Sequence, residues 1–409
     1  LTAYDVFFTY AAASSGDISS DYRNRLNSEL LGIVPLSATE LRLYLRANEC
    51  TSLASINLPI IPAHIFDAEF AATAADFFVD GSLAEYERWQ DEMDYDFSAI
   101  IRHPWDDAPT VSSGKFVWDE WQRGEYIRLR AVDGDLVYEM VDVPGSREEV
   151  DGFLAGESNI MIGLPYDRWG DVLAREDLQV TTYPGTAWEY LAFNLADPTE
   201  PASAFDKDGN PQEQGVHPIF GDVRVRQAVQ RAINVQAVID AAANGYGTVM
   251  SADQVPLSFA FDPALQPIGY DPLAAEALLE EAGWYTYGNS SVRQCRDCLY
   301  AEPESRLSVT LQYASGYQGH YAAARVIAQQ LQAVGFEVSF SESNLTNARE
   351  QRFDLYLAAW GETYPIAPDH SSLFTSYSDI LGSGNNIGSY NNPELSALLV
   401  EAQTRPGCL

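Results

Sequence analysis

The residues that could carry acid–base or metal chemistry are scattered along the chain. None of the five histidines belongs to an HExxH motif or to another closely spaced ligand pair, so the spacing argues against a catalytic zinc site. Isolated histidines are more often surface groups or hydrogen-bonded core groups than metal ligands. We therefore expect no metal site among them. The histidines are His64, His103, His217, His320 and His370.

The motif Cys295-Arg-Asp-Cys298 is the closest spacing of potentially reactive side chains. A structural zinc site would need a second pair, and Cys50 and Cys408 are far away in sequence. A redox motif would stand at the start of a helix beside a strand, whereas this one follows a predicted helix and precedes a predicted strand. We expect a small disulfide loop formed in an oxidising compartment, with zinc binding as the alternative.

The remaining candidate motifs are incomplete. Asp206–Asn210 resembles part of a calcium loop but lacks the twelve-residue ligand spacing, and an Asp-Gly turn explains it as well. The Gly-Tyr-Gly at 245–247 lacks a third glycine, Gly114-Lys115 is not a phosphate loop, and no GxSxG is present. The sequence therefore predicts no catalytic residue, no metal and no cofactor.

The charge of the chain excludes two classes of partner. The 409 residues carry 59 acidic and 24 basic side chains, a formal net charge of −35. Such a field repels nucleic-acid phosphates and anionic membrane surfaces. The length favours two or three domains. No apolar run is long enough to span a bilayer, and no signal-peptide pattern opens the chain.

Apolar periodicity predicts the elements that must position any site. In the first half, residues 41–45 alternate as a strand does, residues 126–138 resemble an antiparallel hairpin, and residues 85–97 suggest a surface helix or loop. The second half alternates strands with helices, which favours a partly parallel sheet with a buried central strand at 353–360. The predicted helices are 223–233, 235–243, 272–282 and 321–334, and the other predicted strands are 307–313 and 336–340.

Seven segments, in the same order, resemble motifs of the family-5 solute-binding proteins of ABC importers. The most specific is Gly221–Asn234, which resembles the signature helix of that family. The other segments are Leu1–Val6, Leu58–His64, Ser112–Phe116 with Trp121–Glu125, Ala155–Glu157, Tyr190–Asn194, and Tyr270–Pro272 with Glu281–Gly283.

The resemblance implies an α/β fold of the periplasmic-binding-protein type II class, with two lobes of mixed β-sheets flanked by helices. Residues 1–195 would form the remainder of lobe I, without its N-terminal strands. Residues 196–409 would form lobe II, without the C-terminal return to lobe I, and the hinge crossing would lie near Asn194. On this interpretation the sequence is a fragment truncated at both ends, so the secretion signal lies outside it.

The resemblance also implies a function without a catalytic step. The protein would be an extracytoplasmic monomer, periplasmic or anchored at the cell surface. It would capture a peptide or another mid-sized organic solute in an interlobe cleft by domain closure and deliver it to ABC permease subunits. The alternatives are a nickel- or metal-chelate-binding protein, a sensory receptor of the same fold and, less favoured, a secreted hydrolase.

The resemblance places the expected ligand residues at the end of the central strand, because Trp360, Gly361, Glu362, Thr363 and Tyr364 match the cleft segment of the family. Aromatic faces bury a large area at low entropy cost. Many peptide-binding relatives carry, three residues after this tryptophan, an aspartate that pairs with the peptide's amino group. Here that residue is Thr363. The neighbouring Glu362 would point to the opposite face from Thr363 in an extended segment. Because a buried ammonium group without a carboxylate partner is costly, a peptide with a free amino group is disfavoured. The W-G-x-x-Y spacing also resembles the nickel-chelate relatives.

Tyr313, on the predicted strand 307–313, completes the candidate ligand set. No metal ligand is expected among these residues.

Overall fold

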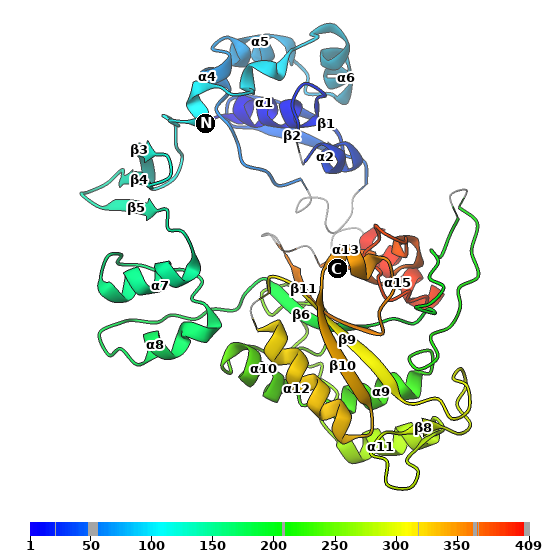
Figure 1. Cartoon of the computed structure of the whole chain (residues 1–409). Coiled ribbons are helices and arrows are strands. Elements are labelled where there is room, and N and C mark those ends of the chain that lie inside the picture. Colours follow the sequence, from blue (N-terminus) through cyan, green and yellow to red (C-terminus); the bar gives the residue numbers. More distant parts are fainter. Residues whose placement is uncertain are drawn as a thin grey trace. The chain divides into compact units, whose positions relative to one another are not determined.

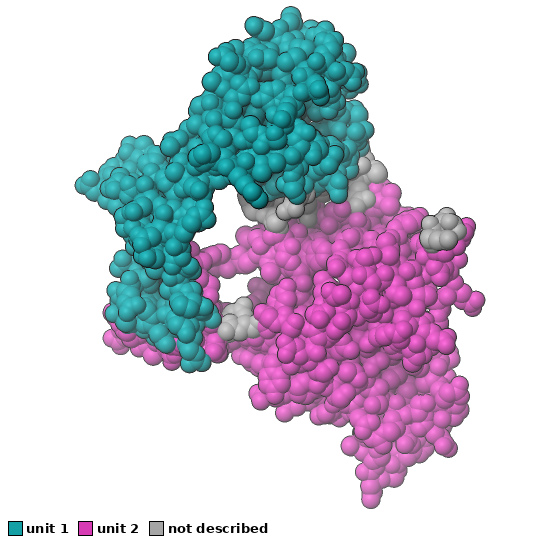
Figure 2. Space-filling model, turned by 45° about the horizontal axis from the view of Figure 1, so that its top comes forward, with its two compact units in different colours: residues 1–161, 403–409 teal, residues 162–402 magenta. Residues whose placement is uncertain are grey.

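A computed structural model describes residues 1–20, 22–47, 56–206, 209–317, 319–362, 366 and 368–404. The chain divides into two compact units. The first covers Leu1–Met161 together with the segment from Gln403, and the second covers Ile162–Ala402 (Figure 2). Among the described residues, no helix has the length and apolar character needed to cross a membrane.

The first unit is built on an aromatic core around the N-terminal helix. Phe7 and Phe8 are almost fully buried, and their rings meet Phe78 at 5.0 Å and Phe70 at 4.8 Å, edge to face. The elements of this unit are α1 (Ala3–Ser14), α2 (Arg23–Glu29), β1 (Leu30–Pro35), β2 (Leu41–Leu45), α4 (Ala63–Phe66), α5 (Phe70–Phe77), α6 (Leu83–Glu92), η1 (Phe97–Ile100), η2 (Pro104–Asp106), β3 (Phe116–Gln122), β4 (Tyr126–Ala131), β5 (Val137–Val141) and α7 (Ser146–Ala155).

Helix α6 is more buried than its sequence suggests. The acidic composition of residues 85–97 favours a surface element, yet Tyr86 and Trp89 are buried against the aromatic core. Glu85 is buried too, because its carboxylate accepts hydrogen bonds from the backbone N–H groups of residues 79–81. A buried carboxylate is tolerated where several donors satisfy it.

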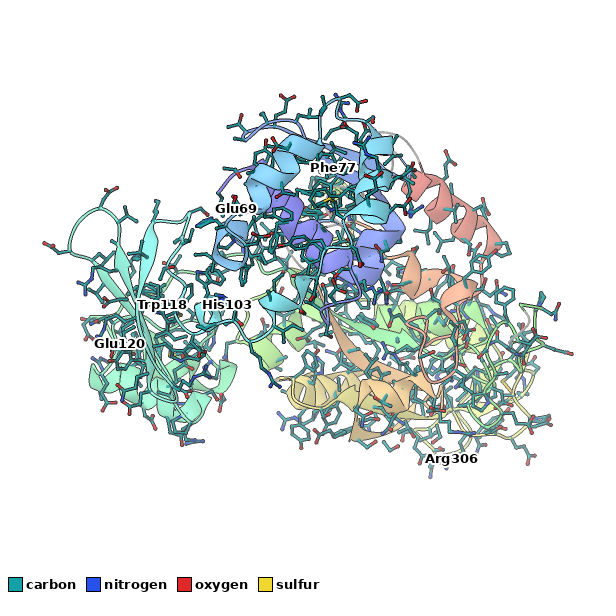
Figure 3. All side chains as sticks on the ribbon, turned by 90° about the horizontal axis from the view of Figure 1, so that it is seen from above. Glu69, Phe77, His103, Trp118, Glu120 and Arg306 are labelled. Carbon is teal, nitrogen blue, oxygen red and sulfur yellow. A yellow bond between two sulfur atoms is a disulfide. The ribbon has the colours of Figure 1, made fainter. Side chains whose placement is uncertain are left out.

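Strands β3, β4 and β5 form a separate antiparallel sheet, which confirms the predicted hairpin. Arg128 on the central strand contacts Glu120 and Glu139 on either side, each at 2.8 Å. Figure 3 marks Trp118 and Glu120 on this sheet.

The second unit contains a four-stranded mixed sheet in the order β10-β9-β11-β6 (Figure 1). Its elements are η3 (Tyr166–Arg168), α8 (Trp169–Leu173), β6 (Ala187–Phe193), α9 (Val223–Ala232), α10 (Val235–Ala243), α11 (Pro272–Glu281), β7 (Trp284–Tyr285), β8 (Gln294–Cys295), β9 (Ser308–Ala314), α12 (His320–Ala333), β10 (Glu337–Ser343), α13 (Leu345–Arg349), β11 (Leu355–Gly361), α14 (Ser371–Phe374), η4 (Ser376–Ser378) and α15 (Pro393–Thr404).

The predicted partly parallel sheet is confirmed. Strand β9 runs parallel to both β10 and β11, and helix α12 connects β9 to β10. Strand β6 pairs with β11 antiparallel over seven residue pairs. Strand β11 is therefore central, as its nearly continuous apolar run predicts.

The two faces of the sheet bury different residues. Leu311, Leu357 and the partly buried Leu191 pack on one face, in a large core that includes α9, α11 and α12. Tyr356 and Ala358 alternate to the other face, in a smaller cluster. The predicted helix starts are also confirmed. The side chains that cap α9, α10 and α11 accept backbone N–H groups, and they are Asp222, Asn234 and Asp271.

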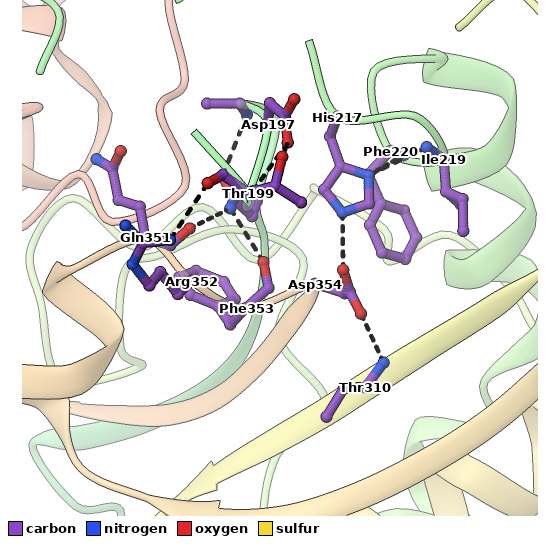
Figure 4. A network of polar contacts seen from close by, with 12 residues as sticks. Asp197, Thr199, His217, Ile219, Phe220, Thr310, Gln351, Arg352, Phe353 and Asp354 are labelled. Carbon is purple, nitrogen blue, oxygen red and sulfur yellow. Dashed lines mark hydrogen bonds and ion pairs between the residues drawn. The ribbon is translucent and has the colours of Figure 1, made fainter. Parts of the chain in front are cut away.

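A buried polar network ties the segment after β6 to the central strands (Figure 4). His217 Nδ1 accepts the backbone N–H groups of Ile219 and Phe220, so its Nε2–H donates to Asp354, 3.0 Å away. The other oxygen of Asp354 accepts the Thr310 N–H at 2.7 Å. His217 therefore holds the start of the signature helix against β9 and β11.

Asn194 closes the end of β6 in the same way. Its amide donates to the carbonyls of Gln351 and Phe353, and its oxygen accepts the Ala196 N–H. The side chain is fully buried. This explains why a polar residue follows the apolar strand at that position.

The compact units divide between residues 161 and 162, whereas the expected lobes divide between 195 and 196. Strand β6 precedes the expected lobe boundary but pairs with β11, which follows it. The lobe boundary near Asn194 stays a prediction.

The cysteine motif has the expected form, because Cys295 and Cys298 are joined by a disulfide beside Gly283. Cys50 and Cys408 lie outside the described residues. The partial calcium motif contains a turn in which Asn210 donates to the Asp206 carboxylate, while residues 207–208 lie outside the description.

The polar network makes a testable prediction about stability. His217→Ala leaves two buried N–H groups and one carboxylate without their partner, and we expect it to lower the free energy of unfolding by roughly 2–4 kcal/mol. Urea unfolding measures this difference. His64→Ala, at a half-exposed histidine of the first unit, should change it by less than about 0.5 kcal/mol. If both substitutions lowered the free energy of unfolding equally, the stabilising role of the His217 hydrogen bonds would be contradicted.

The disulfide makes a second prediction. Cys295 and Cys298 should resist alkylation in the unfolded, unreduced protein and become labelled after reduction. Mass spectrometry of the peptide that contains both cysteines gives the result. Full labelling without reductant would show that the two thiols are free.

Candidate functional site

The candidate site lies at the carboxyl end of the central strand β11. Trp360 pairs in register with Trp188 of the neighbouring β6, so the two indoles lie on the same face of the sheet. The ladder continues one step beyond the strand, because the Glu362 N–H donates to the Thr186 carbonyl at 2.9 Å. Alternation then places the Glu362 side chain on the face of Trp360.

An apolar cluster supports the two indoles. Trp188 is 8% exposed, and it packs with Val255, Ile366 and Leu373. Trp360 is only partly buried at the edge of this cluster, as are Tyr190, Met250 and Phe374. The cluster joins the sheet edge to two segments that are remote in sequence, near residues 250–255 and 366–374.

His370 connects these same segments through ion pairs. It is 2% exposed, and its Nε2 lies 2.5 Å from Glu362 Oε1. Its Nδ1 lies 2.8 Å from Asp253 Oδ2 and 3.2 Å from Gln254 Nε2. The imidazole also contacts both indoles, with centroids 5.7 Å from Trp188 and 6.2 Å from Trp360. His370 thus occupies the centre of the polar part of the site.

The protonation state of His370 follows from these partners. Burial alone would lower the pKa of His370, but the hydrogen bonds and charges of Asp253 and Glu362 outweigh that effect and raise the pKa. Since a carboxylate faces each ring nitrogen, the doubly protonated imidazolium satisfies both partners. Below this raised pKa, the side chain is a buried cation between two carboxylates.

The structure brings together only part of the predicted ligand set. Trp360 and Glu362 share one face, and Gly361 lies between them, where an added Cβ would meet no atom within 4 Å. Tyr313 lies on the opposite, helix-covered face, where its ring contacts Tyr321 of α12 at 6.2 Å. The structure therefore separates Tyr313 from Trp360.

Thr363 and Tyr364 lie outside the described residues, and their roles as ligands stay predictions.

Sequence reasoning missed three residues of this site: Trp188, Asp253 and His370. Trp188 could have been found, because it alternates with Tyr190 along a strand with aromatic residues on one face. Asp253 and His370 carry no local signal, since they stand in irregular segments separated by more than a hundred residues. Only tertiary contacts bring them to Glu362.

Comparison with known proteins assigns the family. Residues 1–381 match the model of the bacterial extracellular solute-binding proteins, family 5, middle region. The chain belongs to this family. The oligopeptide-binding protein AppA of Bacillus subtilis is 24% identical over 310 residues, which are 72% of this chain and 51% of AppA. The chain thus spans about half the length of that relative.

Two further comparisons agree with the family. Di/tripeptide-binding protein 1 of Pseudomonas aeruginosa is 26% identical over 184 residues, which are 42% of this chain and 30% of that protein. The crystal structure of the ABC transporter substrate-binding protein CtaP from Listeria monocytogenes matches with a TM-score of 0.68 at 18% identity. That match covers 100% of this chain and 72% of CtaP, and it confirms the expected two-lobe α/β fold class.

The His370 ion pairs make a prediction about pH. The pKa is raised in the folded protein, so the stabilisation is fully present below the unfolded-state pKa of about 6.5 and is lost as pH rises through the folded pKa. His370→Gln should therefore destabilise the protein most at pH 6, by roughly 2 kcal/mol or more. The difference in the free energy of unfolding between the wild type and His370→Gln should be smaller at pH 9.

Chemical unfolding of both proteins between pH 6 and 9 measures that trend. Gln266→Ala, at an exposed residue that does not titrate, serves as the control and should give a difference that does not vary with pH. A deficit of His370→Gln that stays constant or grows with pH would contradict a raised pKa.

Proposed function

We propose that the protein is the substrate-binding component of an ABC importer that captures a peptide or another mid-sized organic solute and delivers it to permease subunits. The observation that carries this proposal is family membership over residues 1–381. Relatives named for oligopeptides and for di- and tripeptides support the peptide class. The proposal includes an extracytoplasmic location, a monomeric state and no catalytic step.

The carboxyl end of β11 offers the aromatic surface that such a binding site needs. The partly exposed Trp360 offers an apolar face, while Trp188 and the cluster behind it hold that face in place. An aromatic surface loses little entropy on binding and accepts varied side chains, which suits solutes of mixed composition.

Capture of a solute depends on contacts that the closed state makes with it and the open state does not. A solute shifts the protein toward a closed state only through the interactions it gains there. In this proposal Trp360 provides such an interaction, and Thr363 and Tyr364 line the same site. Mass spectrometry of material released from the denatured full-length protein identifies the solute and separates a peptide from a metal chelate.

The role of Trp360 is tested by Trp360→Ala in the full-length protein. We expect the affinity for the released solute to fall at least tenfold, a loss of about 1.4 kcal/mol, because the aromatic face is removed. Isothermal titration calorimetry measures the affinity. Trp118→Ala, at a similarly half-buried tryptophan of the β3–β5 sheet, is the matched control and should leave it unchanged.

Unchanged affinity in Trp360→Ala would remove this residue from the site. Multiple turnover of the solute by the purified protein would contradict a binding function and favour the hydrolase alternative.

A further inference from the structure

The carboxylate of Glu362 is well placed to recognise a solute. Its side chain is 11% exposed and lies on the same face as the partly buried Trp360. A carboxylate beside an aromatic ring is a favourable position for a cation, since both groups attract positive charge. Considered alone, Glu362 would favour a solute that carries an ammonium group.

Below its pKa, His370 already supplies a cation at this place. His370 Nε2 lies 2.5 Å from Glu362 Oε1, and its Nδ1 lies 2.8 Å from Asp253 Oδ2. A neutral imidazole has only one N–H and could donate to only one of these carboxylates, whereas the imidazolium donates to both. The histidine is held in this orientation by the rings of Trp188 and Trp360.

A solute ammonium would have to compete with this internal cation. Removing one partner of a buried ion pair is costly, because the remaining charge is left without compensation. A solute amine next to His370 would also meet a like charge in a site of low dielectric. A neutral group beside Trp360 avoids both costs.

We propose that His370 is a specificity-determining residue of the solute site, an internal counter-ion that occupies Glu362 and selects solutes with no ammonium group beside Trp360. This inference rests on the proposed function. The substrate class it names is a peptide with a blocked or distant amino group, or another uncharged organic solute.

The selection depends on pH. The charged groups that contact His370 among the described residues are Asp253, from the segment before α11, and Glu362, from the end of β11. Its neighbour Asp369 accepts the Ser371 N–H instead. As pH rises and the imidazolium loses its proton, one of the two carboxylates loses its N–H partner, and the internal cation no longer repels an ammonium group. Discrimination against ammonium solutes therefore weakens at high pH.

The test uses a matched pair of probes on the full-length protein at pH 6. The probes are Ala-Leu-Ala amide with a free amino terminus and the same peptide with an acetylated terminus. We expect calorimetry to show at least tenfold tighter binding of the acetylated form to the wild type. In His370→Gln this ratio should fall at least tenfold, while in the control His64→Gln it should stay as in the wild type.

A wild type that prefers the free amine, or a ratio unchanged in His370→Gln, would overturn the inference. If His370→Gln fails to fold, His370→Asn decides the question. The preference for the acetylated peptide should fall at least tenfold in this variant too, because it also lacks the internal cation. A preference that stays as in the wild type would overturn the inference.

Failure of both peptides to bind would contradict the peptide form of the proposed function without deciding the role of His370. Proton NMR titration of His370 then tests the ion pair on which the inference depends. The midpoint should lie above 6.5 in the wild type and fall in Glu362→Gln. A midpoint unaffected by Glu362→Gln would overturn the inference.

Discussion

The antiparallel pairing of β6 with β11 is the interaction on which the described site depends. The other neighbour of β11 is parallel, so β6 is the strand whose start meets the carboxyl end of β11. That geometry places Trp188 opposite Trp360. The pairing is secured at its other end by Asn194 and by the His217–Asp354 contact. These buried polar groups have specific partners, so they define the register more sharply than apolar contacts would.

The second constraint on the site is the charge of its carboxylates, which needs compensation by a cation. A chain with a net charge of −35 attracts cations along much of its surface. At the end of β11 two carboxylates converge, and burial would make their mutual repulsion expensive. The imidazolium of His370 offsets both charges and joins three segments at the same time. The same ion pairs therefore stabilise the surrounding loops.

Much of the fold could be predicted from local patterns. The caps at Asp222, Asn234 and Asp271, the alternation in β9 and the apolar run of β11 all correspond to observed elements. The burial of helix α6 was not predicted from the sequence. Its many charged residues indicate a surface element, although Tyr86 and Trp89 are buried. The location of Trp360 and Glu362 at the end of the central strand could be predicted from the sequence. Tyr313 lies on the opposite face of the sheet from Trp360, and only the register in which β9 and β11 pair shows this.

By itself the sequence determined the family, the strand–helix–strand order and the position of the aromatic edge, because periodicity, capping residues and motif order are local properties of the chain. Only the tertiary structure decided which charges meet at that edge. Asp253, Glu362 and His370 come from segments whose conformations are set by long-range packing, and no spacing in the sequence encodes their distances. An ion pair forms where folding brings opposite charges together away from water, and that juxtaposition belongs to the folded protein.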